Sequence, residues 1–490
     1  MLKLKMYIDG KWKESISKKT QDVINPATGE VIAKAASGNA EDARIAIETA
    51  RKTFDSGIWS EMPNSERASF LFKIADKIEE ISEELIRLET LDNGKTFRES
   101  GYDVSDAAEC FRYYAGLITK MDGQTYSASE TIQTIVIHEP VGVCGLIVPW
   151  NHPFLMCAWK IAPALAAGNT IVFKPSEMTP ITATKLFEII EEVGIPDGVA
   201  NLVMGPGREV GNEISTNSLV DQISLIGGTN TGRQIMKAAS ENITNISLEL
   251  GGKSPNIIFS DADFETAVDY ALYGIYFGSG QVCSAGSRIL VEESICQEFT
   301  EKFIERAKQI RVGTGDNPDS EMGPLVSHQH MESVLNYIEI GKEEGAHLAC
   351  GGYRLEENGL DSGYFIAPTV FTHVTPEMRI VREEIFGPVA VIQSFKDEKE
   401  AIYLANHTKY GLAGSVFTND SAKALRVIKK VRAGITYINT YHQGFVQAPW
   451  GGYKQSGIGR GLGTFGLQEF QETKQININL QVEPVGWFEN

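Results

Sequence analysis

Apolar residues recur along this chain with two different periods. In one set, apolar residues follow each other at steps of three and four: Ile74, Ile78, Ile81, Leu85 and Leu88. This spacing predicts an amphipathic helix within residues 64–94. Asn64 is the predicted N-cap of this helix, and Asn93-Gly94 is its predicted end.

Short apolar runs rich in β-branched residues alternate with helical patterns and predict buried strands. A helix is predicted over 181–193, between the first two of three such strands, which cover 170–173, 201–204 and 223–226. Strands that alternate with helices form parallel sheets covered on both faces. We therefore expect a doubly wound sheet from about residue 141 to residue 252.

The same alternation restarts with a strand at 255–259 and a helix from 264 to about 273, and it continues to about residue 439. The predicted fold class is α/β, with two doubly wound domains. Residues 132–138 and 474–480 alternate apolar and polar side chains and fit neither domain. Exposed strands of this kind pair with each other or with another subunit, so they predict a small β element for bridging or oligomerisation.

Composition excludes some classes of partner. The chain has 490 residues and a formal net charge of −19, which argues against nucleic acid and anionic membranes as partners. No secretion signal or run of eighteen apolar residues is visible, so we expect a cytoplasmic protein without a membrane segment. The six cysteines show no zinc-ligand spacing, and no metal is expected.

Two glycine loops each follow a predicted strand. The first contains Gly207 and Gly211 and resembles a dinucleotide fingerprint, but Gly211, its third glycine, comes one residue later than the fingerprint requires. The second begins with Gly227-Gly228 and opens a helix, whose free N–H groups could meet a pyrophosphate. Taken alone, the first loop is more simply a plain strand-to-helix turn. Two such loops on consecutive strand–helix units favour a dinucleotide more than one does, but they only suggest it.

Three residues are candidates for catalysis, each with a plainer alternative. Cys283 lies among small residues and is either a nucleophile or a buried structural thiol. Glu249 lies in an apolar setting, where desolvation favours a general base, or it is a capping or ion-paired glutamate. The amide of Asn151 is either a donor to an oxyanion or part of a turn before proline.

Six motifs in order resemble the aldehyde dehydrogenase superfamily over essentially the whole chain. They are Pro149-Trp150-Asn151, Lys174-Pro175-Ser176-Glu177, Glu249-Leu250-Gly251-Gly252-Lys253, Gly280-Gln281-Val282-Cys283, Glu384-Ile385-Phe386-Gly387-Pro388 and Trp450-Gly451-Gly452-Tyr453-Lys454. The resemblance implies that Cys283 attacks an aldehyde and that Asn151 and the Cys283 N–H hold the oxyanion. Hydride then passes to a nicotinamide, and Glu249 activates the water that releases the acid.

The resemblance also implies an NAD site, with NADP as an alternative. Lys174 and Glu177 are assigned to the adenine ribose, Glu384 to the nicotinamide ribose, and Phe386 to the nicotinamide. Because a 2′-phosphate would meet the charge of Glu177, NAD is favoured. The remaining residues assigned to the cofactor are Val148, Pro149, Trp150, Ser176, Gly207, Gly211, Gly227, Gly228 and Leu250.

Within the superfamily, the chain is most similar to bacterial betaine aldehyde dehydrogenases. Trp159 and Trp450 stand where that group surrounds a quaternary ammonium by cation–π attraction, although they could be ordinary packing residues. His152 replaces a usual tyrosine, Gly444 replaces a usual aromatic residue, and Phe277 presents a smaller face than tryptophan. These departures leave bulky aliphatic, aromatic or retinal-like aldehydes as alternative substrates.

Many relatives carry glutamate where this chain has Gly461, and that carboxylate is thought to relay protons with the lysine matched by Lys160. Its absence predicts slow deacylation. Two rival functions stay open: a catalytically silent protein, and a dehydrogenase that transfers the acyl group to CoA, against which Glu249 argues.

The resemblance implies three parts and a homodimer or homotetramer. We expect residues 1–121 and 141–252 to form the NAD(P)-binding domain. The catalytic domain is expected over 253–455. Residues 122–140 and 470–490 are expected to form the oligomerisation element.

Overall fold

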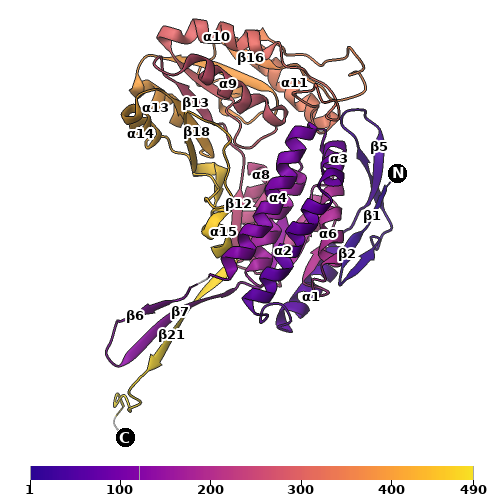
Figure 1. Ribbon diagram of the computed structural model, residues 1–490, viewed down its shortest axis with the longest axis vertical. Coiled ribbons are helices and arrows are strands. Elements are labelled where there is room, and N and C mark those ends of the chain that lie inside the picture. Colours follow the sequence, from indigo (N-terminus) through magenta and orange to yellow (C-terminus); the bar gives the residue numbers. More distant parts are fainter. Residues whose placement is uncertain (1, 121, 489–490) are drawn as a thin grey trace.

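An eight-stranded sheet forms the centre of one of two helix-and-sheet bodies in this computed structural model, which describes residues 2–120 and 122–488 (Figure 1). Its five central strands are parallel, and antiparallel strands flank them at both edges. In spatial order the strands are β20 (Gly457–Ile458), β12 (Asn245–Glu249), β11 (Gln222–Ile226), β8 (Val143–Ile147), β9 (Thr170–Lys174), β10 (Ala200–Leu202), β2 (Met6–Ile8) and β3 (Lys11–Lys13).

The chain order of these strands creates a crevice at their carboxyl ends. From β8 the chain runs outward through β9 and β10, and it then returns to the other side of β8 to form β11 and β12. Helices make the crossings: α5 (Pro153–Ala166), α6 (Ile181–Glu192), the short α7 (Asn212–Thr216) and α8 (Thr229–Ala239). Ligands bind where the strand order reverses in this way, here between β8 and β11.

A seven-stranded sheet forms the second body, and all its strands are parallel except the edge strand β15. In spatial order they are β15 (His347–Cys350), β16 (Thr369–Thr372), β17 (Val389–Phe395), β14 (Arg288–Glu292), β13 (Pro255–Ile258), β18 (Ala413–Phe417) and β19 (Ile435–Ile438). Its helices are α9 (Phe264–Tyr276), α10 (Glu293–Ala307), α11 (His328–Glu343), α12 (Arg379–Arg382), α13 (Glu398–Asn406) and α14 (Ser421–Ile428). The predicted α/β class with two doubly wound sheets is confirmed.

The prediction of one helix within residues 64–94 is wrong in two respects. Two helices occupy this segment, α2 (Asn64–Glu80) and α3 (Ser82–Asn93), because Ile81 between them has φ −109° and ψ 23°. Asn64 does not cap α2; its amide donates to the Ile118 carbonyl at 3.0 Å. The predicted end is correct, since Gly94 has the left-handed φ of 90°.

The N-terminal helices α1 (Ala40–Asp55), α2, α3 and α4 (Phe97–Ile118) lie against the first sheet's body (Figure 1). Helix α4 packs against α2 and α5, and this places it beside the crevice. A small sheet of β1 (Leu2–Leu4), β5 (Val31–Ala36) and β4 (Thr20–Ile24) lies next to these helices.

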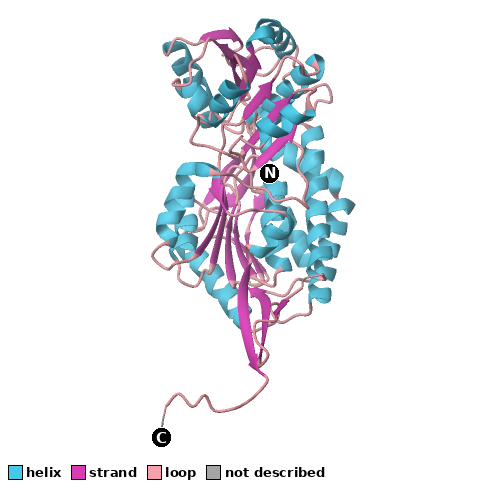
Figure 2. Ribbon diagram, turned by 90° about the vertical axis from the view of Figure 1, so that its left-hand side faces the viewer, coloured by secondary structure: helices cyan, strands magenta, loops and turns pink. Residues whose placement is uncertain are grey.

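The two segments that fitted neither domain pair with each other. Strand β7 (Ile132–Pro140) runs antiparallel to β21 (Gln471–Asn479) along its whole length, and β6 (Gln124–Tyr126) adds a third strand. This sheet projects from the body as an arm (Figure 2). The predicted domain limits stay predictions, and residues 1, 121, 489 and 490 within them lie outside the described part. The short β20 and α15 (Gly463–Gln468), beyond the predicted catalytic domain, return to the first body, on β12 and α5 respectively.

Within residues 2–120 and 122–488, no helix combines the length and apolar character that crossing a bilayer requires. The same residues contain no cluster of three or more histidine, cysteine or acidic side chains arranged to hold a metal ion.

Candidate active site

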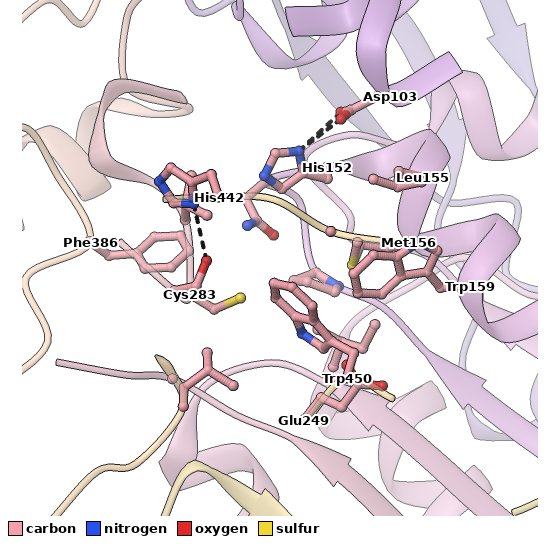
Figure 3. Close-up of a pocket in the computed structure, with 18 of the residues that line it drawn as sticks. Asp103, His152, Leu155, Met156, Trp159, Glu249, Cys283, Phe386, His442 and Trp450 are labelled. Carbon is pink, nitrogen blue, oxygen red and sulfur yellow. Dashed lines mark hydrogen bonds and ion pairs between the residues drawn. The ribbon is translucent and has the colours of Figure 1, made fainter. Parts of the chain in front are cut away.

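A cavity of about 570 Å³ lies at the carboxyl ends of β8, β11 and β12, facing the second body. Cys283, Glu249 and Asn151 all line it, although they come from distant parts of the chain (Figure 3). Most residues predicted for the cofactor and substrate line the same cavity: Pro149, Trp150, His152, Trp159, Gly227, Gly228, Leu250, Phe277, Glu384, Phe386, Gly444 and Trp450. The structure therefore brings the three catalytic candidates and these residues to one place.

Cys283 lies on a loop shaped by a sharp turn after α9. Three successive residues, Gly278, Ser279 and Gly280, have φ of 60°, 57° and 72°, and the Ser279 hydroxyl donates to the Gly323 carbonyl at 2.8 Å. Burial, followed by the negative charges of Glu384 and Glu249, raises the pKa of Cys283 to about 12. The thiol is therefore protonated in this arrangement, and attack requires a base or a nearby positive charge.

Asn151 follows β8 and is tied to the loop that carries Cys283. Its side-chain amide is 8% exposed and donates one N–H to the Gln281 carbonyl at 2.9 Å. An amide nitrogen has two hydrogens, so a second N–H is left for a ligand in the cavity. This arrangement suits a donor to an oxyanion on the carbon that Cys283 attacks.

Glu249 is the last residue of β12 and forms a buried ion pair with Lys160 of α5, whose ammonium donates to Oε1. Its Oε2 is buried and has no hydrogen-bond partner among the described residues. A Cβ at Gly461 would lie 2.6 Å from Oε1 of Glu249. The absence of a side chain at Gly461 therefore leaves room for the Glu249 carboxylate in this position. Glu249 is thus ion-paired, as the plainer alternative holds, and one of its oxygens is still available for the predicted role as a base.

The glycine loop at 227–228 lies at the positive end of α8. Gly228 is the N-cap residue, and no side chain caps this helix end. A Cβ at Gly228 would meet nothing within 4 Å. The Thr229 hydroxyl in the first turn is buried and has no partner among the described residues. Such a helix end, open and with an unsatisfied polar group, fits a phosphate ligand.

Glu384 crosses from the second body to the glycines after Glu249. It accepts the Gly252 N–H at 3.1 Å, and burial raises its pKa to about 7 against the opposing effects of that N–H and Lys253. Phe386 has a φ of 62° and stands edge-on to Trp150, with ring centroids 5.2 Å apart. Both residues line the cavity, as Gly251 does.

Six residues assigned to the cofactor do not line this cavity: Val148, Lys174, Ser176, Glu177, Gly207 and Gly211. Lys174 ends β9, and its aliphatic chain lies about 4 Å from the Cβ position of Gly211. Its ammonium is 3.8 Å from the Glu177 carboxylate, while the Ser176 hydroxyl accepts the Met178 N–H. Val148 follows β8, and the other five residues form a separate group that follows β9 and β10, next to the crevice.

Several aromatic side chains line the cavity beside the catalytic candidates. Trp159 and Trp450 stand edge to face, with centroids 5.3 Å apart. His152 stacks on Phe277 at 6.2 Å and 24°. At Gly444, the nearest atom to an added Cβ is Trp450 Cζ3 at 3.8 Å, so a side chain there would fill open space beside the tryptophan.

Sequence reasoning missed the residues that α4 contributes. Tyr102, Asp103 and Asp106 line the cavity from this helix, and His442 lines it from a distant loop. Burial, Asp103 and Glu109 raise the pKa of Asp106 to about 6, whereas burial lowers that of His442 to about 4. No local motif marks these positions, because only the packing of α4 against α5 brings them to the cavity.

Comparison with known proteins agrees with this geometry. Residues 12–476 match the model of the aldehyde dehydrogenase family. The chain belongs to the aldehyde dehydrogenase family. The predicted family and its enzyme class, an oxidoreductase, are thereby confirmed.

Several relatives are similar over their full length. A betaine aldehyde dehydrogenase of Bacillus subtilis is 51% identical over 484 residues, which cover 99% of each chain. A peroxisomal aminoaldehyde dehydrogenase of Pisum sativum is 42% identical and covers 99% of this chain and 97% of its own. The crystal structure of a betaine aldehyde dehydrogenase of Staphylococcus aureus with NAD+ has a TM-score of 0.99 at 51% identity, covering 100% of this chain and 97% of its own.

Proposed function

We propose that the protein oxidises betaine aldehyde to its acid, with NAD as the oxidant and water as the second reactant. The observation that carries the proposal is that Cys283, Glu249 and Asn151 line one cavity together with the pair Trp159 and Trp450. Tryptophan faces attract a quaternary ammonium by cation–π interaction, and the acidic Asp106 adds to that attraction. Relatives named for betaine aldehyde and for aminoaldehydes support an ammonium-bearing substrate.

The residues present fit an NAD cofactor. The open N-terminus of α8 suits the pyrophosphate, and Lys174 and Glu177 suit the adenine ribose. Glu384 suits the hydroxyls of the second ribose, and Phe386 suits the nicotinamide. Glu177 would repel a 2′-phosphate, so NAD is favoured over NADP. The relative from Staphylococcus aureus, solved with NAD+, supports this assignment.

Cys283 begins the reaction by forming a bond from Sγ to the aldehyde carbon, while its proton passes through water to Glu249. The carbonyl oxygen becomes an oxyanion, which accepts the free N–H of Asn151 and the backbone N–H of Cys283. Bound NAD would supply the hydride acceptor, and loss of hydride from that carbon would give a thioester on Cys283. Once Glu249 has released the first proton to solvent, water bound to Glu249 gives it a proton and forms a bond from its oxygen to the thioester carbon. The carbon–sulfur bond then breaks, Cys283 leaves as a thiolate and the acid departs.

The test is NADH formation with betaine aldehyde, propanal, benzaldehyde, decanal and retinal, with Cys283→Ala as the control. By far the highest kcat/KM for betaine aldehyde supports the proposal. A second candidate, oxidation of bulky aldehydes, is favoured by the open space at Gly444, and a preference for decanal or retinal would establish it. If turnover required CoA, the acyl group would be transferred to CoA and not to water. That result would contradict the role of Glu249 in hydrolysis.

We further propose a homodimer or homotetramer that uses the arm of β6, β7 and β21. Most of the β21 side chains are exposed, and the described tail after β21 also exposes Val482, Val485, Trp487 and Phe488. A projecting, partly apolar sheet with open edges is a typical docking element. Light scattering in solution tests this: a monomer at micromolar concentration would contradict it.

A further inference from the structure

The turn that precedes Cys283 has a backbone conformation that most residues avoid. Gly278, Ser279 and Gly280 all have positive φ, and Ser279 is not a glycine. Such a conformation costs free energy at a non-glycine residue and persists only where the surrounding structure imposes it. Contacts from outside the turn must therefore hold the loop that carries Cys283.

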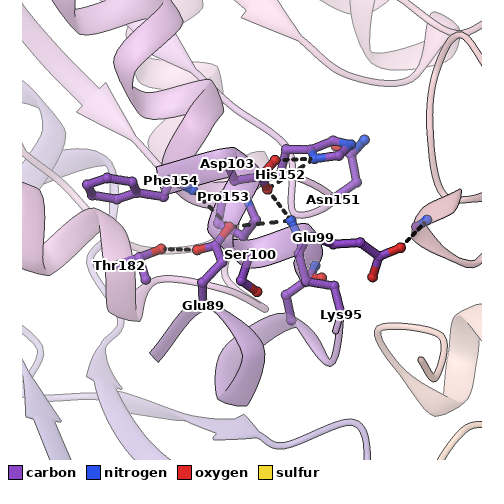
Figure 4. Close-up of polar contacts among 12 residues, drawn as sticks. Glu89, Lys95, Glu99, Ser100, Asp103, Asn151, His152, Pro153, Phe154 and Thr182 are labelled. Atoms are coloured by element: carbon purple, nitrogen blue, oxygen red, sulfur yellow. Dashed lines mark hydrogen bonds and ion pairs between the residues drawn. The ribbon is translucent and has the colours of Figure 1, made fainter. Parts of the chain in front are cut away.

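One such contact comes from the first body of the molecule. Glu99 lies in the first turn of α4 and is 5% exposed, and its Oε1 accepts the Gly278 N–H at 2.8 Å. Figure 4 shows this side chain pointing from α4 toward the second body. Hydrogen bonds that a carboxylate accepts are stronger than those between neutral groups. Glu99 therefore links the turn firmly to a helix of the other body.

The other end of this link is itself held in place. Oε2 of Glu99 accepts both the backbone N–H and the hydroxyl of Thr96 at 2.8 Å, which closes a capping box at the start of α4. Just before this cap, the Lys95 ammonium donates to Asp103 and lies 3.4 Å from a carboxylate oxygen of Glu89. These three side chains are at most 4% exposed. The start of α4 is therefore a fixed base for the contact with the turn.

Gln281, the residue after the turn, connects it to the catalytic groups. The Gln281 N–H donates to the Gly278 carbonyl at 3.0 Å, and the Gln281 carbonyl accepts the Asn151 amide at 2.9 Å. Cys283 follows two residues later. A shift of the turn would therefore move the thiol and the oxyanion donor relative to the substrate. Misplacement of reacting groups by about 1 Å can slow a reaction roughly 10²-fold.

We propose that Glu99 is a positioning residue, which holds the turn at 278–280 so that Cys283 and Asn151 meet the aldehyde carbon together. This inference rests on the proposed function and adds to it a residue that does not line the cavity. Because Glu99 acts through the turn and contacts neither substrate nor cofactor, its loss should slow the chemical step and leave binding nearly unchanged.

The test is single-turnover NADH formation from betaine aldehyde at saturating NAD, together with NAD affinity and thermal unfolding. Glu99→Asp separates the two contacts of this side chain. An aspartate here can still close the capping box, as Asp42 does in α1, but it is one methylene too short to reach Gly278 as well. We expect the rate to fall between about tenfold and a hundredfold, with KM, NAD affinity and Tm nearly unchanged.

Two variants serve as controls. Glu99→Gln keeps the length of the side chain and an oxygen that can accept the Gly278 N–H, so its rate should stay within about threefold of the native rate. Asp42→Ala removes a matched carboxylate, which caps α1 and accepts the Ile16 N–H at 3.1 Å, outside the lining of the cavity. Asp42→Ala should lower Tm and leave the rate unchanged.

The outcomes are distinguishable. A fall in rate confined to Glu99→Asp supports the inference. A native rate in Glu99→Asp would overturn it, as would equal slowing in Glu99→Gln, because the reach of the side chain would then make no difference. Slowing of Asp42→Ala in proportion to its Tm would also overturn it, since the rate would then follow stability alone. Absence of NADH from the native protein with every aldehyde would instead contradict the proposed function.

Discussion

Replacing Asn151 by alanine separates catalysis from stability sharply. Among the described residues the side chain makes one hydrogen bond, to the Gln281 carbonyl, and in the proposed mechanism its second N–H donates to the oxyanion. Losing an oxyanion donor costs about 3 to 4 kcal/mol at the transition state, or roughly 10²–10³ in kcat. Losing the single internal bond costs only about 1 kcal/mol of folding stability.

The assay is stopped-flow NADH formation in a single turnover with saturating betaine aldehyde, alongside thermal unfolding. The expected result is a large fall in the rate, a nearly unchanged KM and a small fall in Tm, because the interaction forms mainly in the transition state. Asn151→Asp is the matched control: it keeps the shape and places an acceptor against the oxyanion, so it should be at least as slow. A fall in rate of less than about tenfold for alanine would refute this role.

Three further predictions follow from charged side chains of the site. Lys160→Met leaves the Glu249 carboxylate unpaired and should cost about 3–5 kcal/mol in unfolding experiments, whereas adding Glu249→Gln should recover most of that loss without activity. Glu384 has a pKa of about 7 and accepts hydroxyls better when ionised, so NAD affinity measured by fluorescence should tighten as pH rises from 6 to 8. Glu384→Gln should remove that pH dependence. If the pH dependence of NAD affinity survives in this variant, it arises from another group. Glu177→Gln should improve the kcat/KM ratio of NADP to NAD by about tenfold, and an unchanged ratio would place the 2′-hydroxyl away from Glu177.

Strong local patterns predicted much of the fold. The β-branched runs at β9, β11 and β13 are strands, since each is buried on both faces of a parallel sheet. The break at Ile81 was not predictable, because its apolar side chain continues the helical period while its backbone leaves it. The pairing of β7 with β21 was one of two open alternatives, since alternation identifies an exposed strand but not its partner.

Some residues of the candidate site could also be predicted from the sequence, and others could not. Cys283, Glu249 and Asn151 lie in motifs at the ends of strands or in loops, so their neighbourhoods in sequence indicate their chemistry. Asp103 and Lys95 lie in and just before an ordinary amphipathic helix, and charges there usually face solvent. Only tertiary packing buries them together, and no single-sequence signal announces that packing.

The most direct test of the central claim is a trapped intermediate on Cys283. Glu249→Gln, mixed with NAD and betaine aldehyde, should form at most one equivalent of NADH per subunit, more slowly than the native protein because Glu249 also accepts the Cys283 proton, and then stop. Mass spectrometry should find the acyl group on the peptide that contains Cys283, and Cys283→Ala should give neither NADH nor adduct. NADH formed without an adduct, or continuous turnover by Glu249→Gln, would contradict a thioester whose hydrolysis depends on Glu249.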